Sequence, residues 1–168
     1  IKLVDPDDNE VREGQPGELA IRSPALFSGY WKDPETNKKD FKGGWFHMGD
    51  VFRRNSDGTL TFVDRRKYLI KSGGENIYPA EIERIILTDA RVIDAAVVRK
   101  MDPHWGEIPV AFVARKDDSL NQDAVLNILI GKLARYKHPK EIRFLAENEL
   151  PRSTTGKIMR HILEERLK

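Results

Sequence analysis

Three segments of the chain carry polar residues whose types and spacing could do chemistry. In Gly43–Asp50 a carboxylate follows a glycine at the expected edge of a strand. Asp64–Glu83 joins a basic cluster to a short apolar strand, a glycine pair and the start of a helix. Leu150–Arg160 carries a lysine directly after Thr-Thr-Gly. Each of these segments also has a purely structural explanation.

Asp50 has the chemistry of a ribose ligand. Two carboxylate oxygens can accept hydrogen bonds from two adjacent hydroxyls, and this pairing recurs in nucleotide-binding sites. The alternative is a turn in which Asp50 only caps the backbone. The segment by itself does not decide between the two interpretations.

The second segment offers Arg65 and the pair Gly73-Gly74. A planar guanidinium can bind phosphate or ribose oxygens through parallel hydrogen bonds. Glycines permit positive φ and let a backbone approach a ligand closely. A β-turn with a solvated charged face would explain the same residues without any function.

Lys157 is expected on a mobile loop just before a helix. An ammonium group there is a compact, movable cation that can stabilise negative charge developing on a phosphate or carboxylate. The Gly-x4-Gly-Lys-Ser/Thr spacing of a Walker A loop is absent. A helix-capping loop with an exposed lysine is the structural alternative.

The remaining polar residues form no metal-binding pattern. The four histidines are scattered without metal-ligand spacing, so we predict no metal site. The lack of cysteine excludes disulfides and thiolate metal sites, and it fits a reducing compartment such as the cytoplasm.

The composition predicts a folded, rather polar protein of one ordinary domain or two small ones. Of 168 residues, 39% are hydrophobic and 33% charged. The 29 Lys and Arg are scattered among 27 Asp and Glu, which is weak support for a nucleic-acid partner. No apolar stretch approaches the roughly 18 residues needed to span a membrane. Because Ile1–Asp5 reads as a strand already under way, we expect a piece of a longer protein.

Residues 1–64 are expected to form a small β-rich subdomain. Residues 29–45 are predicted to be an ordered surface loop with a short helix near Pro34–Lys38. The turn signal Asn55-Ser56-Asp57-Gly58 predicts a hairpin. Strand patterns cover residues 1–4, 17–22, 51–53 and 59–63.

Residues 65–168 mix strand and helix patterns, which predicts a compact α+β domain of about 100 residues. Ile130 is expected on the inward face of the second predicted helix, together with Leu126, Leu129 and Leu133. The boundary between the two parts falls near residues 64–67, where a short charged junction suits a hinge. Helices are predicted at residues 79–87, 122–133 and 158–167, and strands at 92–98, 108–113 and 141–145.

The three segments occur in the order and at the spacing seen in the superfamily of acyl-CoA synthetases, peptide-synthetase adenylation domains and beetle luciferases. The chain resembles the C-terminal portion of such an adenylate-forming enzyme over essentially its whole length. Residues 1–64 would be the end of the AMP-binding N-terminal domain, and residues 65–168 the mobile C-terminal lid. The motifs that carry the resemblance are Gly17-Glu18-Leu19 with Gly29-Tyr30-Trp31, Gly49-Asp50, Asp64–Glu83 and Pro151–Lys157.

The resemblance implies a role for several residues. Asp50 would bind the ATP ribose, and Arg65 would contact the ribose and phosphate region. Lys67 falls on the hinge position. Lys157 would bridge the substrate carboxylate and α-phosphate oxygens during adenylation. The face used for thioesterification with CoA would comprise Lys71, Ser72, Gly73 and Gly74.

The implied reaction joins a carboxylic acid to CoA through an acyl-adenylate, with ATP and Mg²⁺. Met48 stands where the family commonly has Thr, which removes a hydroxyl beside Asp50 but not the carboxylate. The phosphate loop, the adenine-binding segment, the acyl pocket and the Mg²⁺ ligands are expected in a missing N-terminal domain. We therefore expect the chain alone to be inactive.

Other functions stay open at this point. An adenylation domain that loads a carrier protein shares these motifs, and so does a luciferase-like oxidase, although nothing here indicates oxygen chemistry. A natural subunit could complete an active site in trans. A non-enzymatic basic binding module could use Arg65–Lys67 and Lys132–Lys140, but it lacks aromatic platforms and one-sided charge.

Overall fold

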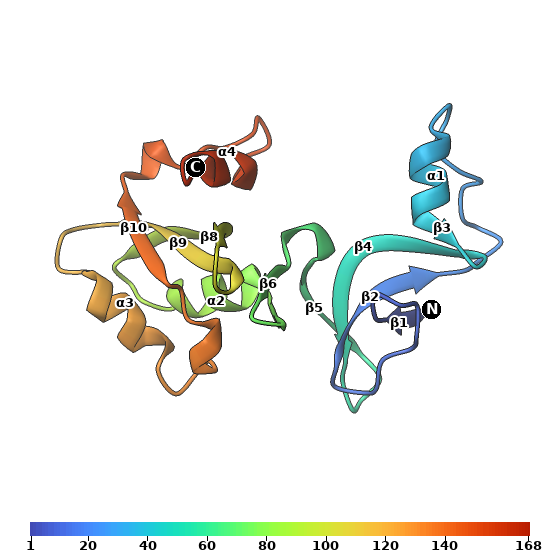
Figure 1. The fold of residues 1–168 in the computed structure, drawn as a ribbon, viewed down its shortest axis with the longest axis horizontal. Coiled ribbons are helices and arrows are strands. Elements are labelled where there is room, and N and C mark those ends of the chain that lie inside the picture. The colour runs from blue at the N-terminus through green and yellow to red at the C-terminus, as the bar shows by residue number, and fades with distance from the viewer. The chain divides into compact units, whose positions relative to one another are not determined.

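The computed structural model describes residues 1–168, which divide into two compact units, Ile1–Lys67 and Tyr68–Lys168. Four α-helices and ten strands are present, which confirms the predicted α+β class (Figure 1). The sequence pattern placed the boundary near residues 64–67, and the first unit of the structure ends at Lys67. None of the helices is both long enough and apolar enough to cross a membrane.

The first unit is built on a five-stranded antiparallel sheet in the order β1-β2-β4-β3, with β5 paired to β4. The predicted hairpin is confirmed: the Asn55 N–H donates to Thr59 O at 2.9 Å, and Gly58 N–H to Asn55 O at 2.9 Å. The five strands of this sheet are β1 (Lys2–Val4), β2 (Pro16–Ile21), β3 (Phe41–Lys42), β4 (Trp45–Arg54) and β5 (Leu60–Arg65).

Helix α1 (Pro34–Asp40) confirms the short helix predicted near residues 34–38. The Asp33 carboxylate accepts the Thr36 N–H at 3.0 Å, and Pro34 occupies the first turn, where its missing N–H costs nothing. Capping and proline therefore fix where this helix begins.

The second unit is built on a five-stranded sheet in the order β10-β9-β6-β7, with β8 paired to β9. Only the β9–β10 pair is parallel. The strands are β6 (Ile70–Ser72), β7 (Glu75–Ile77), β8 (Val92–Asp102), β9 (Gly106–Arg115) and β10 (Glu141–Leu145). The helices are α2 (Pro79–Ile86), α3 (Gln122–Leu129) and α4 (Arg160–Glu165), and the 3₁₀ turns are Arg66–Tyr68, Arg135–Lys137 and Glu147–Glu149.

Apolar side chains cover both faces of this sheet, as the apolar runs predicted. Ala95 and Val97 of β8 pack with α2 and α3 in one core, whereas Ala96 and Val98 pack with Leu163 of α4 in another. Successive strand residues point to opposite faces, so α4 lies on the face away from α2 and α3 (Figure 1). The sheet is the middle layer of three.

The prediction for Ile130 was wrong. Helix α3 ends at Leu129, the backbone turns extended at Ile130 with ψ 131°, and Ile130 is 63% exposed. Gly131 follows with φ 74°, a conformation that suits glycine at a helix end. Helix α4 is likewise shorter than predicted, although Ile158 and Leu167 still pack against the core beside it.

Candidate active-site residues

Asp50 and Arg65 lie opposite each other on β4 and β5 in the first unit. Arg65 Nε is 3.0 Å from Asp50 Oδ1, and the two form an ion pair. The contact lacks hydrogen-bond geometry, so the buried Oδ1 atom accepts no hydrogen bond. The structure therefore brings two of the predicted nucleotide ligands together, and an acceptor oxygen keeps its capacity for a donor.

A buried carboxylate beneath Asp50 had no role in the sequence-based site. Glu18 Oε1 accepts the Gly49 N–H at 3.1 Å, and Glu18 Oε2 lies 2.5 Å from Arg66 Nη1 and 3.3 Å from His47 Nδ1. His47 Nε2 lies 3.4 Å from Asp8 Oδ1 without hydrogen-bond geometry. A glutamate inside an otherwise apolar strand was the available signal, because a buried charge needs partners.

Lys67, the predicted hinge residue, is an exposed residue of the 3₁₀ turn Arg66–Tyr68 and the last residue of the first unit. Asp64, at the other end of the junction, is buried, and its Oδ1 accepts the Arg65 N–H at 2.7 Å. The junction is thus anchored on the first-unit side.

The predicted thioesterification face is a hairpin. Lys71 and Ser72 end β6, Gly73 and Gly74 form the turn, and β7 follows before α2 begins. The helix predicted at residues 79–87 is confirmed by α2, whereas the short strand β7 between the glycines and that helix was missed. Gly73 and Gly74 have φ 59° and 86°, which explains the glycine pair.

Trp105 covers Gly73 in the second unit. The Gly73 N–H donates to Trp105 O at 2.9 Å, and a Cβ on Gly73 would lie 2.7 Å from the indole ring. The Asp102 carboxylate holds the turn by accepting hydrogen bonds from the N–H groups of Trp105 (2.8 Å) and His104 (2.9 Å). These bonds also lower the pKa of the Asp102 carboxyl below its usual range. The Lys71 N–H donates to Glu107 at 2.8 Å, so the hairpin is tied both to β9 and to the turn that precedes β9.

Lys157 lies on a closed loop. The Ser153 N–H donates to Lys157 O at 2.8 Å, and Gly156 N–H to Ser153 O at 2.9 Å. Arg152 and Ile158 form a bridge that closes the loop. The helix-capping alternative is not supported, since Met159 is the N-cap of α4 and no side chain caps it. The exposed Lys157 ammonium makes no hydrogen bond or ion pair with residues 1–168, so its charge is available.

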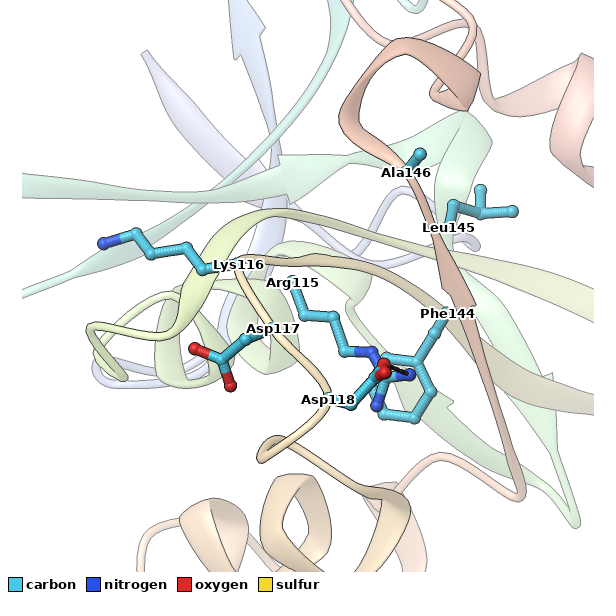
Figure 2. Close-up of a pocket in the computed structure, with 7 residues that line it drawn as sticks. All are labelled: Arg115, Lys116, Asp117, Asp118, Phe144, Leu145 and Ala146. Carbon is cyan, nitrogen blue, oxygen red and sulfur yellow. Dashed lines mark hydrogen bonds and ion pairs between the residues drawn. The ribbon is translucent and has the colours of Figure 1, made fainter.

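Two surface cavities lie in the second unit, and neither is lined by Lys157 or by the hairpin of Gly73 and Gly74. One, of about 510 Å³, is shown in Figure 2, where Arg115 pairs with Asp118 and stacks over Phe144 at 4.2 Å. Its other lining residues are Lys116, Asp117, Leu145 and Ala146. The second cavity, of about 680 Å³, is lined by Glu147, Asn148, Leu150 and Arg152. No cluster of three or more His, Cys, Asp or Glu suited to a metal ion is present in residues 1–168.

Known proteins are similar to this chain in sequence and in fold. Residues 81–157 match the family described as AMP-binding enzyme C-terminal domain. The long-chain-fatty-acid–CoA ligase of Escherichia coli O157:H7 is 41% identical over 164 residues, which are 98% of this chain and 29% of the ligase. Over residues 81–157 the chain belongs to this family of AMP-binding enzyme C-terminal domains. The resemblance carried by the motifs is thereby confirmed.

Other adenylate-forming enzymes agree with this assignment. Indoleacetate–CoA ligase of Aromatoleum aromaticum is 40% identical over 94% of this chain and 31% of its own length. ATP-bound MatB from Rhodopseudomonas palustris has a TM-score of 0.87 and 34% identity, covering 98% of this chain and 33% of MatB. The chain thus spans about a third or less of the length of these relatives.

Proposed function

We propose that this chain is part of an ATP-dependent carboxylic acid–CoA ligase and that it supplies the ribose ligands, the pivot and the catalytic lysine of that enzyme. The observation that carries the proposal is the paired Asp50 and Arg65 in one unit together with the unpartnered Lys157 ammonium on a closed loop in the other. Relatives that share 40–41% of its residues are named CoA ligases, which supports the same reaction class.

In the first half-reaction a carboxylate oxygen attacks the α-phosphorus of ATP, the bond to pyrophosphate breaks, and acyl-AMP forms. Asp50, which lies beside Arg65, accepts hydrogen bonds from the ribose hydroxyls. Lys157 stabilises the negative charge on the α-phosphate and the attacking carboxylate. Mg²⁺ would neutralise the pyrophosphate, and its ligands are expected in the N-terminal domain of the full-length enzyme.

In the second half-reaction the CoA sulfur attacks the acyl carbon, the thiol proton is lost, and the bond to AMP breaks. We infer that the unit after Lys67 pivots between the two steps and replaces the Lys157 loop with the hairpin of Lys71, Ser72, Gly73 and Gly74. A cation suits the phosphoryl-transfer step, whereas a tight backbone turn suits the passage of a slender thiol.

A basic binding module is less well supported. Arg66 pairs with buried Glu18, and Lys137 pairs with Glu81 at 2.7 Å, so parts of both basic clusters are already neutralised. Strong, salt-dependent DNA binding would be the evidence for this alternative.

The test uses the full-length protein that contains this chain. ATP–pyrophosphate exchange measures adenylation, and CoA thioester formation from supplied acyl-AMP measures the second step. We expect Lys157→Ala to lower adenylation by about 10²- to 10³-fold, the range for removing a charge-stabilising donor, and to spare the second step. Residues 1–168 alone should form no acyl-AMP. Adenylation unaffected by Lys157→Ala would overturn the assignment, and use of a carrier protein but not CoA would redirect it.

A further inference from the structure

Two arginines flank the loop that carries Lys157, and each binds a carboxylate outside the loop. Arg152 precedes the loop and pairs with Asp94 of β8. Arg160 follows it and pairs with Glu83 of α2. These two partners lie 58 and 77 residues away in sequence, so the loop is held at both ends by long-range contacts.

The Arg160 anchor is partly buried and rests on the buried carboxylate of Glu83. Arg160 Nη2 donates to Glu83 Oε2 at 2.9 Å, and Arg160 Nη1 also donates to Val97 O at 3.0 Å. Glu83 Oε1 accepts the Val97 N–H at 2.6 Å. This closed network fixes the start of α4 on β8, and its loss would disturb the fold as a whole.

The Arg152 anchor acts on the loop itself. Arg152 Nη1 donates to Gly156 O at 3.0 Å, while Nη2 binds Asp94. One guanidinium therefore bridges the carbonyl immediately before Lys157 and a carboxylate of the sheet. The Arg152 side chain is 37% exposed and that of Asp94 is 24% exposed, so solvent screens part of their attraction, and the second hydrogen bond to Gly156 O adds to the hold on the loop.

We propose that Asp94 and Arg152 are positioning residues for Lys157, holding its loop in the geometry that adenylation needs. The inference rests on the proposed function of Lys157. The ammonium itself has no partner in the chain, so its position depends on the backbone that Arg152 and Asp94 hold. A preorganised charge stabilises a transition state without reorganisation, and small displacements of such groups lower rates strongly.

The decisive variants are Asp94→Asn and Arg152→Gln, alone and combined, in the full-length protein. The matched control is Asp118→Asn, which breaks the Arg115–Asp118 pair in the same unit but outside the loop (Figure 2). Arg152→Lys is an intermediate variant, because it keeps the charge near Asp94 and loses the fork that reaches Gly156 O.

We expect Asp94→Asn to slow pyrophosphate exchange by roughly 10- to 100-fold and to leave thioester formation from supplied acyl-AMP unchanged. Pyrophosphate exchange in the double variant should be no slower than in Arg152→Gln alone, since both substitutions break the same Asp94–Arg152 pair. Trypsin should cut after Lys157 faster in Asp94→Asn than in Asp118→Asn, which reports loop order without any activity.

Equal loss of both half-reactions, or unchanged exchange and cleavage in Asp94→Asn, would overturn the positioning role. If the unaltered protein exchanges pyrophosphate and depends on Lys157, that result leaves the proposed function intact. If the unaltered protein forms no acyl-AMP, the proposed function fails and this inference fails with it.

Discussion

Glu18 accepts the backbone N–H of Gly49 at 3.1 Å and thereby holds the residue that precedes Asp50. Its second oxygen binds Arg66, the residue that follows Arg65. One buried carboxylate thus joins β4 to the turn that follows β5, at the positions next to the two proposed ribose ligands.

Glu18→Gln should therefore disturb both stability and nucleotide binding. The amide keeps the size of the side chain but loses the charge that faces Arg66 and His47. We expect a loss of about 1.5–3 kcal/mol in the free energy of unfolding, typical of hydrogen bonds to charged groups, and a raised KM for ATP. Denaturant unfolding and exchange kinetics measure the two effects. Glu13→Gln, at an exposed site, should change neither.

Asp50→Ala tests the ribose carboxylate directly. Loss of a charged acceptor for two hydroxyls should raise the KM for ATP by roughly 10- to 100-fold, equivalent to about 1.5–3 kcal/mol. The KM for ATP of Asp50→Asn should lie between those of the unaltered protein and Asp50→Ala, because one acceptor oxygen remains. Asp57→Asn, in the far turn of the same hairpin, is the control. An unchanged KM for ATP in Asp50→Ala would contradict the assignment.

The proposed site residues could be named from the sequence where a motif keeps them close together. Asp50, Arg65, Gly73-Gly74 and Lys157 each lie in a short recognisable segment. Their supports could not be found in this way, because Glu18 and Gly49 are separated by 31 residues, and Arg152 and Asp94 by 58. Such pairs depend on strand pairing and packing, which local patterns do not specify.

The fold shows the same division between local and long-range information. Hydrophobic periodicity predicted the buried strands and helices of the second unit, but it extended α3 through Ile130 because that residue is apolar. The stop signal was Gly131, whose φ of 74° ends the helix. Strand β7 was missed because its three residues, Glu75–Ile77, are too few to show alternation and depend on pairing with β6.

Gly73→Ala should damage the second half-reaction more than the first. A Cβ at this position would lie 2.7 Å from the Trp105 ring, on a backbone with φ 59°. Left-handed backbone costs about 1–2 kcal/mol, and overpacking adds about 1–3 kcal/mol unless the indole moves. We expect thioester formation from acyl-AMP to fall while pyrophosphate exchange persists.

Gly74→Ala is the matched control for that change. Gly74 also has positive φ, at 86°, but nothing lies within 4 Å of the added Cβ. It should therefore show the backbone cost without the collision with Trp105. Equal effects of the two variants on thioester formation would mean that the Trp105 contact has no part in the second step.

The acid stability of the second unit should depend on Asp89, in the turn between α2 and β8. Hydrogen bonds from the Arg91 side chain, at 2.9 and 2.7 Å, and from its backbone N–H lower the pKa of Asp89 from 3.8 to about 2. A carboxyl with a lowered pKa in the folded state stabilises the fold above its unfolded pKa, and this contribution is lost as the pH falls through the folded pKa. The loss should therefore occur between about pH 4 and pH 2. Asp89→Asn should flatten the pH dependence of the unfolding free energy in that window, measured by denaturant titration of residues 1–168, whereas exposed Asp123→Asn should preserve it.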